Sequence, residues 1–261
     1  MSFYPILKAP DSKGWTTLFN FPPNNWEVRD SSEKYINVTW AEDGKWRSEN
    51  VGKLAFNGIR TFGFDDLPKE LPQDVLPLLS LTLSKLPTHS DNLPQLEVIH
   101  TGVPGWRATL GLSTEHTSTS YQGEIDPFPV TGSMVTFGPF MQFGQGIENF
   151  LILLNIEKSP VARVAQVEIF AADNIAIKAK FNVKNNDATI ISLDGLGFSS
   201  ADLSLIICRG MSAIPLYFSK TSDGTFLSLE HTHPPASYVI HGNRWAAQKI
   251  LKKIWFSRTG Q

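Results

Sequence analysis

Hydrophobic and polar residues alternate along most of this chain. In the N-terminal part, the segment WTTLFNF sets on one side Trp15, Thr17, Phe19 and Phe21. The segment YINVTW sets on one side Ile36, Val38 and Trp40, and on the other Tyr35, Asn37 and Thr39. A period of two residues is that of a β-strand, whose side chains point alternately to the two faces of a sheet. Turn residues such as Gly44 separate these segments, so residues 1–64 are predicted to form β-hairpins.

Prolines interrupt the next segment, residues 65–95, which we interpret as a connector. They are Pro68, Pro72, Pro77, Pro87 and Pro94. The stretch QDVLPLLSLTLSKL fits two structures. One is a short helix that begins at Asp74, and the other is an edge strand in which Leu79, Leu81 and Leu83 alternate with hydroxyl side chains. The pattern alone leaves both open.

Residues 96–242 alternate again, in roughly nine short segments with turn residues between them. WRATLGL sets on one face Trp106, Ala108, Leu110 and Leu112. NFLILLNI is apolar on both faces, which indicates a central strand. VAQVEIFAADNIAIKAKFNV indicates a hairpin that turns near Asp173 and Asn174, with Ile175, Ile177, Ala179, Phe181 and Val183 on one face. The gaps are too short for helical crossovers, so we predict a sandwich of antiparallel strands.

One helix is predicted, over residues 243–257, with Asn243 as its N-cap. Its apolar arc comprises Ala247, Ile250, Leu251, Ile254 and Trp255. We expect this arc to dock on the β-structure. The predicted fold is therefore all-β: a sandwich, an N-terminal hairpin region and one C-terminal amphipathic helix. Residues 1–64 bury little apolar surface alone, so we expect them to pack within one domain.

Composition narrows the environment and the partners. The chain has 261 residues, 41% of them hydrophobic, and 23 basic against 25 acidic side chains. This near balance gives no strong nucleic-acid signal and no chain-wide attraction to a membrane, although a local basic patch stays open. A single cysteine, Cys208, and no visible secretory signal or membrane span predict a soluble cytoplasmic protein. The sequon at Asn37 is then not expected to carry a glycan.

Three of the six histidines lie within eleven positions, at His231, His233 and His241. If the strand of Leu227 and Leu229 stays extended, His231 and His233 continue its buried face to the end of the sandwich. Two such imidazoles can reach one metal ion. However, two prolines follow and no carboxylate appears before Gly242, so we predict no metal site. The hypotheses that remain are hydrogen bonds to strand ends, or an acid–base or ligand-binding role.

A polar loop, residues 113–128, contains the second group of candidates: Glu115, His116, Tyr121, Glu124 and Asp126. Paired carboxylates are typical of glycoside chemistry, yet a solvated loop of this length carries two by chance. A third candidate is Trp245, which the helical pattern sets among Lys249 and Lys252 on the basic side, where an indole can stack under a base or sugar. Cys208 follows apolar residues, and we expect it to be buried and inert.

We expect a non-enzymatic binding module for a carbohydrate or another polar biopolymer, held by loops at one end of the sandwich. N-terminal tryptophans beside amide and carboxylate groups are a further candidate for stacking on sugar rings. Two alternatives stay open: an enzyme that acts on a saccharide through a histidine and carboxylate site, and a scaffolding or assembly protein that forms a homo-oligomer. Nucleotide, serine-hydrolase and zincin motifs are missing, and no cofactor is predicted.

Overall fold

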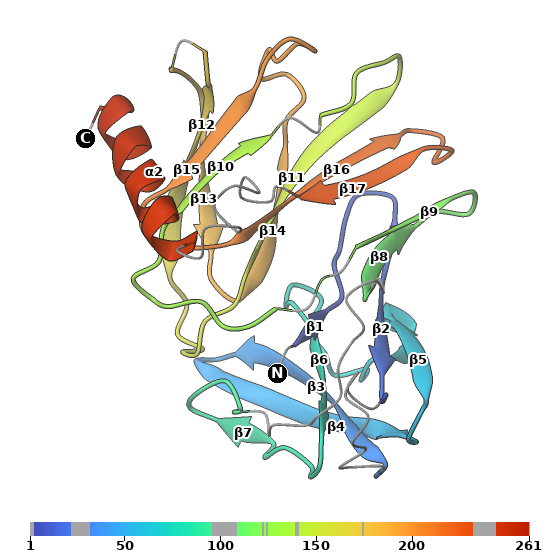
Figure 1. Cartoon of the computed structure of the whole chain (residues 1–261). Helices are drawn as coiled ribbons and strands as arrows, with labels where there is room; N and C mark the ends of the chain where they lie inside the picture. The colour runs from blue at the N-terminus through green and yellow to red at the C-terminus, as the bar shows by residue number, and fades with distance from the viewer. Residues whose placement is uncertain are drawn as a thin grey trace.

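Strands form wherever the alternation predicts them in the part of the chain that is described. The computed structural model describes residues 3–21, 32–95, 109–121, 123, 125–138, 141–173, 175–231 and 244–260, without the side chains of 244–248. The protein is all-β, with four antiparallel sheets and a C-terminal helix (Figure 1). None of the helical segments in these ranges combines the length and the apolarity needed to cross a bilayer.

Two sheets come from the N-terminal half of the chain. The first has the order β1-β6-β3-β4-β7, with β1 Tyr4–Pro5, β3 Lys34–Glu42, β4 Lys45–Leu54, β6 Leu78–Thr82 and β7 His89–Ser90. The second has the order β5-β2-β8-β9, with β2 Lys13–Phe19, β5 Ile59–Gly63, β8 Leu110–Ser113 and β9 Ser118–Tyr121. A 3-10 turn, η1 Phe64–Asp66, follows β5.

These sheets change the organisation expected along the chain. The stretch that fitted both a helix and a strand forms β6, which is hydrogen-bonded between β1 and β3. The proline-rich connector thus contributes strands to the first sheet. The hairpin β8-β9 falls in the range 96–242, yet β8 pairs with β2. The N-terminal sandwich is therefore completed by residues far along the chain.

The other two sheets form the C-terminal sandwich. The outer one has the order β10-β15-β12-β13, with β10 Met134–Gly138, β12 Val164–Ala171, β13 Ala176–Lys184 and β15 Ser204–Cys208. The inner one has the order β14-β11-β16-β17, with β11 Ile147–Asn155, β14 Asp187–Ser192, β16 Ile214–Thr221 and β17 Leu227–His231. The predicted sandwich, the hairpin β12-β13 and the central strand β11 are confirmed.

Strand β11 shows why three apolar layers form. Leu151 and Leu153 face the core between the two C-terminal sheets, whereas Ile152 and Leu154 face the layer shared with the N-terminal half. That shared layer also contains Trp46, so the two sandwiches pack directly on one another (Figure 1). A third cluster fills the N-terminal sandwich and contains Ile6, Leu18, Ile36, Val38, Trp40, Leu54, Phe62, Leu67, Leu79 and Leu81. The expected inward face of Ile36, Val38 and Trp40 is confirmed.

Polar contacts reinforce the seam between the halves. The Trp46 Nε1–H donates a hydrogen bond to the Lys158 carbonyl oxygen at 2.9 Å. The buried Lys220 ammonium lies 2.7 Å from Glu148 Oε2 and 3.0 Å from Asp11 Oδ2. Burial works to lower the pKa of Lys220, but these two carboxylates outweigh it and raise the pKa.

In the first sheet, Asn37 is buried and its side-chain amide donates a hydrogen bond to Thr82 Oγ1 at 2.7 Å. The glycosylation sequon that begins at Asn37 is therefore inaccessible in the fold.

The hairpin β12-β13 departs from the expected pattern at one end. Phe181 and Val183 pack against the core between the sheets, as predicted. Ile177, expected on the same face, is exposed. The register shifts between Ile169 and Phe170, which leaves an extra residue on β13 and turns Ile177 to the opposite side.

Helix α2, Arg244–Arg258, covers part of the outer face of sheet β10-β15-β12-β13 (Figure 1). The expected docking arc is wrong in part. Ile250 and Ile254 remain 61% and 47% exposed, while Trp255 and Phe256 pack against the sheet. The aromatic rings bury more apolar area than the isoleucines do, which favours this rotation of the helix about its axis. The Lys252 ammonium also donates to the Ser133 carbonyl oxygen, and burial lowers the pKa of Lys252.

Candidate functional site

Two of the candidate residues meet where β9 runs beside β17. Leu229 is buried in the layer between the sandwiches, and Leu227 packs against that layer. His231 continues this face, and its ring centroid lies 4.4 Å from that of Tyr121, with the planes at 55°. The alternation expected for β17 is therefore confirmed as far as His231. His233, His241, Glu124 and the side chain of Trp245 lie outside the described residues.

The other candidates from the polar loop lie elsewhere. Glu115 and His116 are exposed at the turn of the β8-β9 hairpin. Thr114 anchors this turn by donating a hydrogen bond to the Gly224 carbonyl oxygen at 2.7 Å. About 10 Å of extended strand separates the turn from Tyr121 at the other end of β9. Asp126 is exposed and follows Tyr121 in sequence, so the hairpin does not bring Glu115 and His116 to Tyr121.

The described residues offer neither a cluster of metal ligands nor a reactive thiol. In these ranges, no three His, Cys, Asp or Glu side chains gather in a way that could hold a metal ion. Cys208 is buried as predicted, and burial raises the pKa of its thiol, which disfavours the nucleophilic thiolate. Cys208 also lines a gap in the core of the C-terminal sandwich, with Met134, Val167 and Met211 among its neighbours. That gap has no room for a water molecule.

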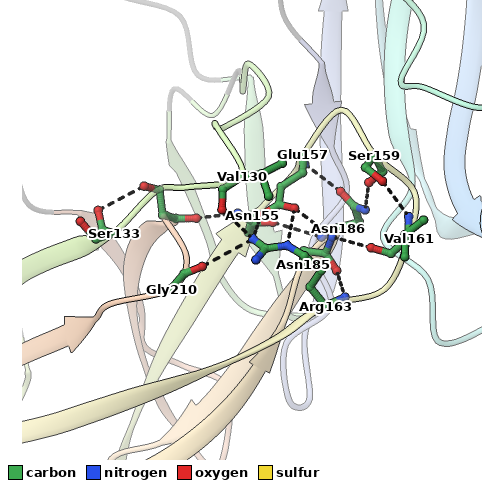
Figure 2. A network of polar contacts seen from close by, with 11 residues as sticks. Val130, Ser133, Asn155, Glu157, Ser159, Val161, Arg163, Asn185, Asn186 and Gly210 are labelled. Carbon is green, nitrogen blue, oxygen red and sulfur yellow. Dashed lines mark hydrogen bonds and ion pairs between the residues drawn. The ribbon is translucent and has the colours of Figure 1, made fainter.

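A second polar constellation ties loops together at one end of the C-terminal sandwich (Figure 2). The Arg163 guanidinium donates to both carboxylate oxygens of buried Glu157, at 3.1 Å from Nε and 2.5 Å from Nη2. Asn185 Nδ2 donates to Glu157 Oε2 at 3.1 Å, and the Asn185 side-chain oxygen accepts from the Arg163 backbone N–H at 2.7 Å. Arg163 also reaches the Val130 carbonyl oxygen at 3.1 Å. Each charged group is engaged by protein partners, so this network is a structural clamp.

The outer face of sheet β5-β2-β8-β9 carries an arrangement of a different kind. Trp15 of β2 is paired across the sheet with Gly63 of β5 on one side and Gly111 of β8 on the other. A Cβ atom at Gly111 would lie 2.2 Å from the Trp15 Cζ2 atom. The indole therefore lies across the backbone of Gly111, in space that only glycine leaves open. Trp15 is half-buried, and its N–H donates to none of the described residues.

Hydroxyl groups surround this indole on the same face. Alternation along the paired strands sets there Thr17, Thr61, Ser113, Ser118 and Ser120. Thr61, Ser118 and Ser120 are exposed. The Thr17 and Thr61 hydroxyl oxygens are 2.9 Å apart and hydrogen-bond one another. The face thus carries a row of alcohols and the Trp15 indole. Exposed Lys13 lies opposite Ser113 at one end of β2, and Phe19 lies opposite exposed Ile59 at the other.

A carboxylate stands at the β5 end of the row that contains Trp15. Asp66 Oδ2 accepts a hydrogen bond from the Gly63 backbone N–H at 2.9 Å. The same oxygen lies 4.0 Å from the place of a Cβ atom on Gly63. Asp66 is exposed, so its second oxygen faces solvent as a strong acceptor. An aromatic ring, several alcohols and a carboxylate therefore share one side of the sheet.

The sequence analysis named the N-terminal tryptophans as a group and did not single out Trp15 among them. Trp40 and Trp46, which stand beside acidic turn residues in sequence, are each 1% exposed and belong to the apolar layers. Trp26 lies outside the described residues. Trp15 was placed correctly on the side of β2 that carries Thr17. Its distinguishing feature, the two glycines opposite it, depends on strand register, which alternation does not reveal.

Comparison of the chain with protein-family models, with curated proteins and with solved structures finds no match in any of the three.

Proposed function

We propose that this protein is a binding module for a carbohydrate, and that the ligand lies on the outer face of sheet β5-β2-β8-β9. The observation that carries the proposal is the half-buried Trp15 indole, which lies across Gly111 among hydroxyl side chains. Sugar rings present apolar C–H faces that stack on an indole, and hydroxyls that pair with polar groups at its edge.

The neighbours of Trp15 fit this ligand better than a charged one. Ser118 and Ser120 donate and accept hydrogen bonds, as sugar hydroxyls do, and Asp66 is a strong acceptor for them. The face has a cation, Lys13, and a carboxylate, Asp66, so it carries no net positive charge for an anionic ligand.

The alternative of a saccharide-cleaving enzyme has less support. Glycoside hydrolysis needs two carboxyl groups that flank one bond, about 5 to 10 Å apart. Glu115 lies at the hairpin turn and Asp126 beyond its base, with the length of β9 between them. His231 stacks on Tyr121 rather than beside either carboxylate. We therefore retain binding without catalysis as the proposal.

The experiment is a glycan-array screen of the purified chain, followed by calorimetric titration of the best oligosaccharide. Trp15→Ala should weaken binding by roughly five- to a hundredfold, because ring stacking contributes about 1–3 kcal/mol. Trp15→Phe keeps a flat ring and should retain most of the affinity. Both variants should fold, since Trp15 belongs to none of the buried core clusters.

His231→Ala serves as the matched control, because it removes an aromatic ring that stacks on Tyr121 away from this face. Its affinity for the oligosaccharide should equal that of the unaltered chain. Unchanged affinity in Trp15→Ala, with a loss in His231→Ala, would move the site to the histidine segment. Absence of any glycan ligand for the unaltered chain would reject the proposal.

A further inference from the structure

Helix α2 concentrates positive charge that the composition of the whole chain conceals. Its fifteen residues hold five basic side chains and no acidic one: Arg244, Lys249, Lys252, Lys253 and Arg258. The chain has 23 basic and 25 acidic residues, so the remainder carries 18 and 25, a net charge of −7. A near-neutral total thus divides into a helix of +5 and a body of −7.

The described cations of this helix are not neutralised by carboxylates. Among the described residues, none of the ion pairs involves α2. Lys252 turns inward to a backbone carbonyl, and the Arg258 guanidinium lies 4.4 Å from the Trp255 ring centroid. Lys249 and Lys253 are exposed, four residues apart on one side of the helix. This positive charge is available to an anionic partner.

Two apolar side chains accompany these lysines. Ile250 and Ile254 are also four residues apart, directly after Lys249 and Lys253 in sequence, and both are largely exposed. Trp255 and Phe256 hold the opposite side of the helix against the sheet. The docked helix is about 22 Å long and lies at the periphery of the molecule (Figure 1). Within it, residues 249–254 form a ridge about 8 Å long, with an apolar pair beside a basic pair.

We infer that this ridge binds the surface of an anionic lipid membrane. A convex helix with apolar and basic residues side by side fits a lipid interface, where the isoleucines enter the acyl boundary and the lysines reach headgroup phosphates. A second copy of the chain is disfavoured, because two such helices would oppose their positive charges. A nucleic acid would engage the lysines through its phosphates but would leave the isoleucines without a partner.

This inference is independent of the proposed carbohydrate site on the other sandwich. The inference concerns binding at the membrane surface, because α2 is too short to span a membrane. We expected no membrane partner because the net charge of the whole chain is near zero. That net charge is the sum of a positive helix and a negative body, so it conceals the charge of the helix.

The test is co-sedimentation of the full chain with vesicles of phosphatidylcholine, with and without phosphatidylserine. The chain should bind only the anionic vesicles. Lys249→Gln with Lys253→Gln should weaken this binding about tenfold or more, and Ile250→Ser with Ile254→Ser should weaken it by a similar factor. All these residues are exposed, so both double variants should keep the thermal midpoint of the unaltered chain.

Matched controls use exposed residues of the same types elsewhere. Ile59→Ser, and the pair Lys69→Gln with Lys85→Gln, should bind the anionic vesicles as the unaltered chain does. The inference is overturned if the anionic vesicles do not retain the chain, or if the isoleucine variants bind them undiminished. It is also overturned if polyuridylate binds in a lysine-dependent manner while the vesicles do not.

Discussion

The outer sheets of the two sandwiches differ in the polarity of their outer faces and in how far those faces are covered. The outer face of β10-β15-β12-β13 is apolar, with Val135, Phe137, Phe170, Leu205 and Ile207. Helix α2 covers it, and the Trp255 ring packs edge-on against Phe137 at 5.1 Å between centroids. The outer face of β5-β2-β8-β9 carries mainly hydroxyls around the Trp15 indole, with Lys13, Phe19 and Ile59 toward its ends, and several of its side chains are exposed. An apolar face needs a cover, whereas a face of alcohols stays in water at little cost.

The sandwiches also differ in the chemistry of their buried polar contacts. The N-terminal one pairs mostly neutral groups, such as the Thr39 and Ser48 hydroxyl oxygens at 2.9 Å and Asn37 with Thr82, and its buried Lys34 ammonium donates to the neutral Ser32 hydroxyl at 2.7 Å. The C-terminal one buries a charge, Glu157, and holds it with Arg163 (Figure 2). Removing one partner of a buried neutral pair costs about 1–3 kcal/mol, whereas a buried charge that loses its partner costs about 3–5 kcal/mol.

The largest expected effect is therefore that of Arg163→Met. It leaves the Glu157 carboxylate buried without its cation and should lower the free energy of unfolding by about 3–5 kcal/mol. In a chain of this size that shift corresponds to a thermal midpoint roughly 10 °C lower. Adding Glu157→Gln removes the stranded charge, keeps an acceptor for Asn185, and should recover part of the loss.

Lys45→Met is the matched control in the N-terminal sandwich, because Lys45 pairs with exposed Asp91 at the surface. It should change the free energy of unfolding by less than about 1 kcal/mol. Equal losses in Arg163→Met and Lys45→Met would show that the burial of Glu157 does not set the cost of losing its cation.

The next effect concerns the cover on the C-terminal sandwich. Trp255→Ala removes the ring that packs on Phe137 and should cost about 2–3 kcal/mol, less than a fully buried tryptophan because Trp255 is half-buried. Hydrogen exchange should increase in α2 and in β10. Ile254→Ala, one position earlier on the exposed side, should change neither quantity measurably. If Ile254→Ala releases the helix and Trp255→Ala does not, α2 docks through its isoleucine side, which would contradict the rotation described above.

The smallest effect lies at the seam between the sandwiches. Burial raises the pKa of the Asp187 carboxyl, with a further contribution from Asp74 in the other half, against hydrogen bonds from Ala188 and Thr189. A carboxyl whose pKa is raised by folding favours the folded state below its unfolded pKa and loses that contribution as pH rises through its folded value. Asp187→Asn should therefore have a slightly higher thermal midpoint than the unaltered chain at neutral pH.

That difference should shrink as the pH falls below about 4, where the unfolded carboxyl is also protonated. A thermal midpoint for Asp187→Asn that is lower at neutral pH, with the gap closing at acid pH, would reverse the sign of the pKa shift. Asp173→Asn, at the exposed turn between β12 and β13, is a control without a buried carboxyl.

Alternation predicted which side chains share a face, and for most strands it did so correctly. Ile36, Val38 and Trp40 point inward, and Trp15 and Thr17 point outward, because the period of a strand is a local property of the backbone. It failed at Ile177, where one extra residue in β13 reverses the faces. Bulges leave little trace in hydrophobic pattern, so such reversals appear only when strands are paired.

Pairing between distant strands was beyond the sequence. Nothing in Gly63 or Gly111 indicates that both lie opposite Trp15, yet that register leaves the space in which the Trp15 indole lies. The rotation of α2 was missed for a related reason. The helical pattern gives the apolar arc around Ile250 without regard to the sheet. In the structure, the aromatic and aliphatic side chains on the outer face of the sheet pack against Trp255 and Phe256 instead. The positive charge of α2 was missed as well, because the composition gives only the net charge of the whole chain.

The central claim, that Trp15 forms a ligand platform, is tested most directly by the indole N–H signals in a nitrogen-15 correlation spectrum. The chain has seven tryptophans, and the spectrum of Trp15→Phe identifies the Trp15 signal by its loss. During titration with the oligosaccharide found by the array, the Trp15 signal should move saturably, while those of buried Trp40 and Trp46 stay in place. A Trp15 signal that stays fixed while the ligand binds would contradict the account.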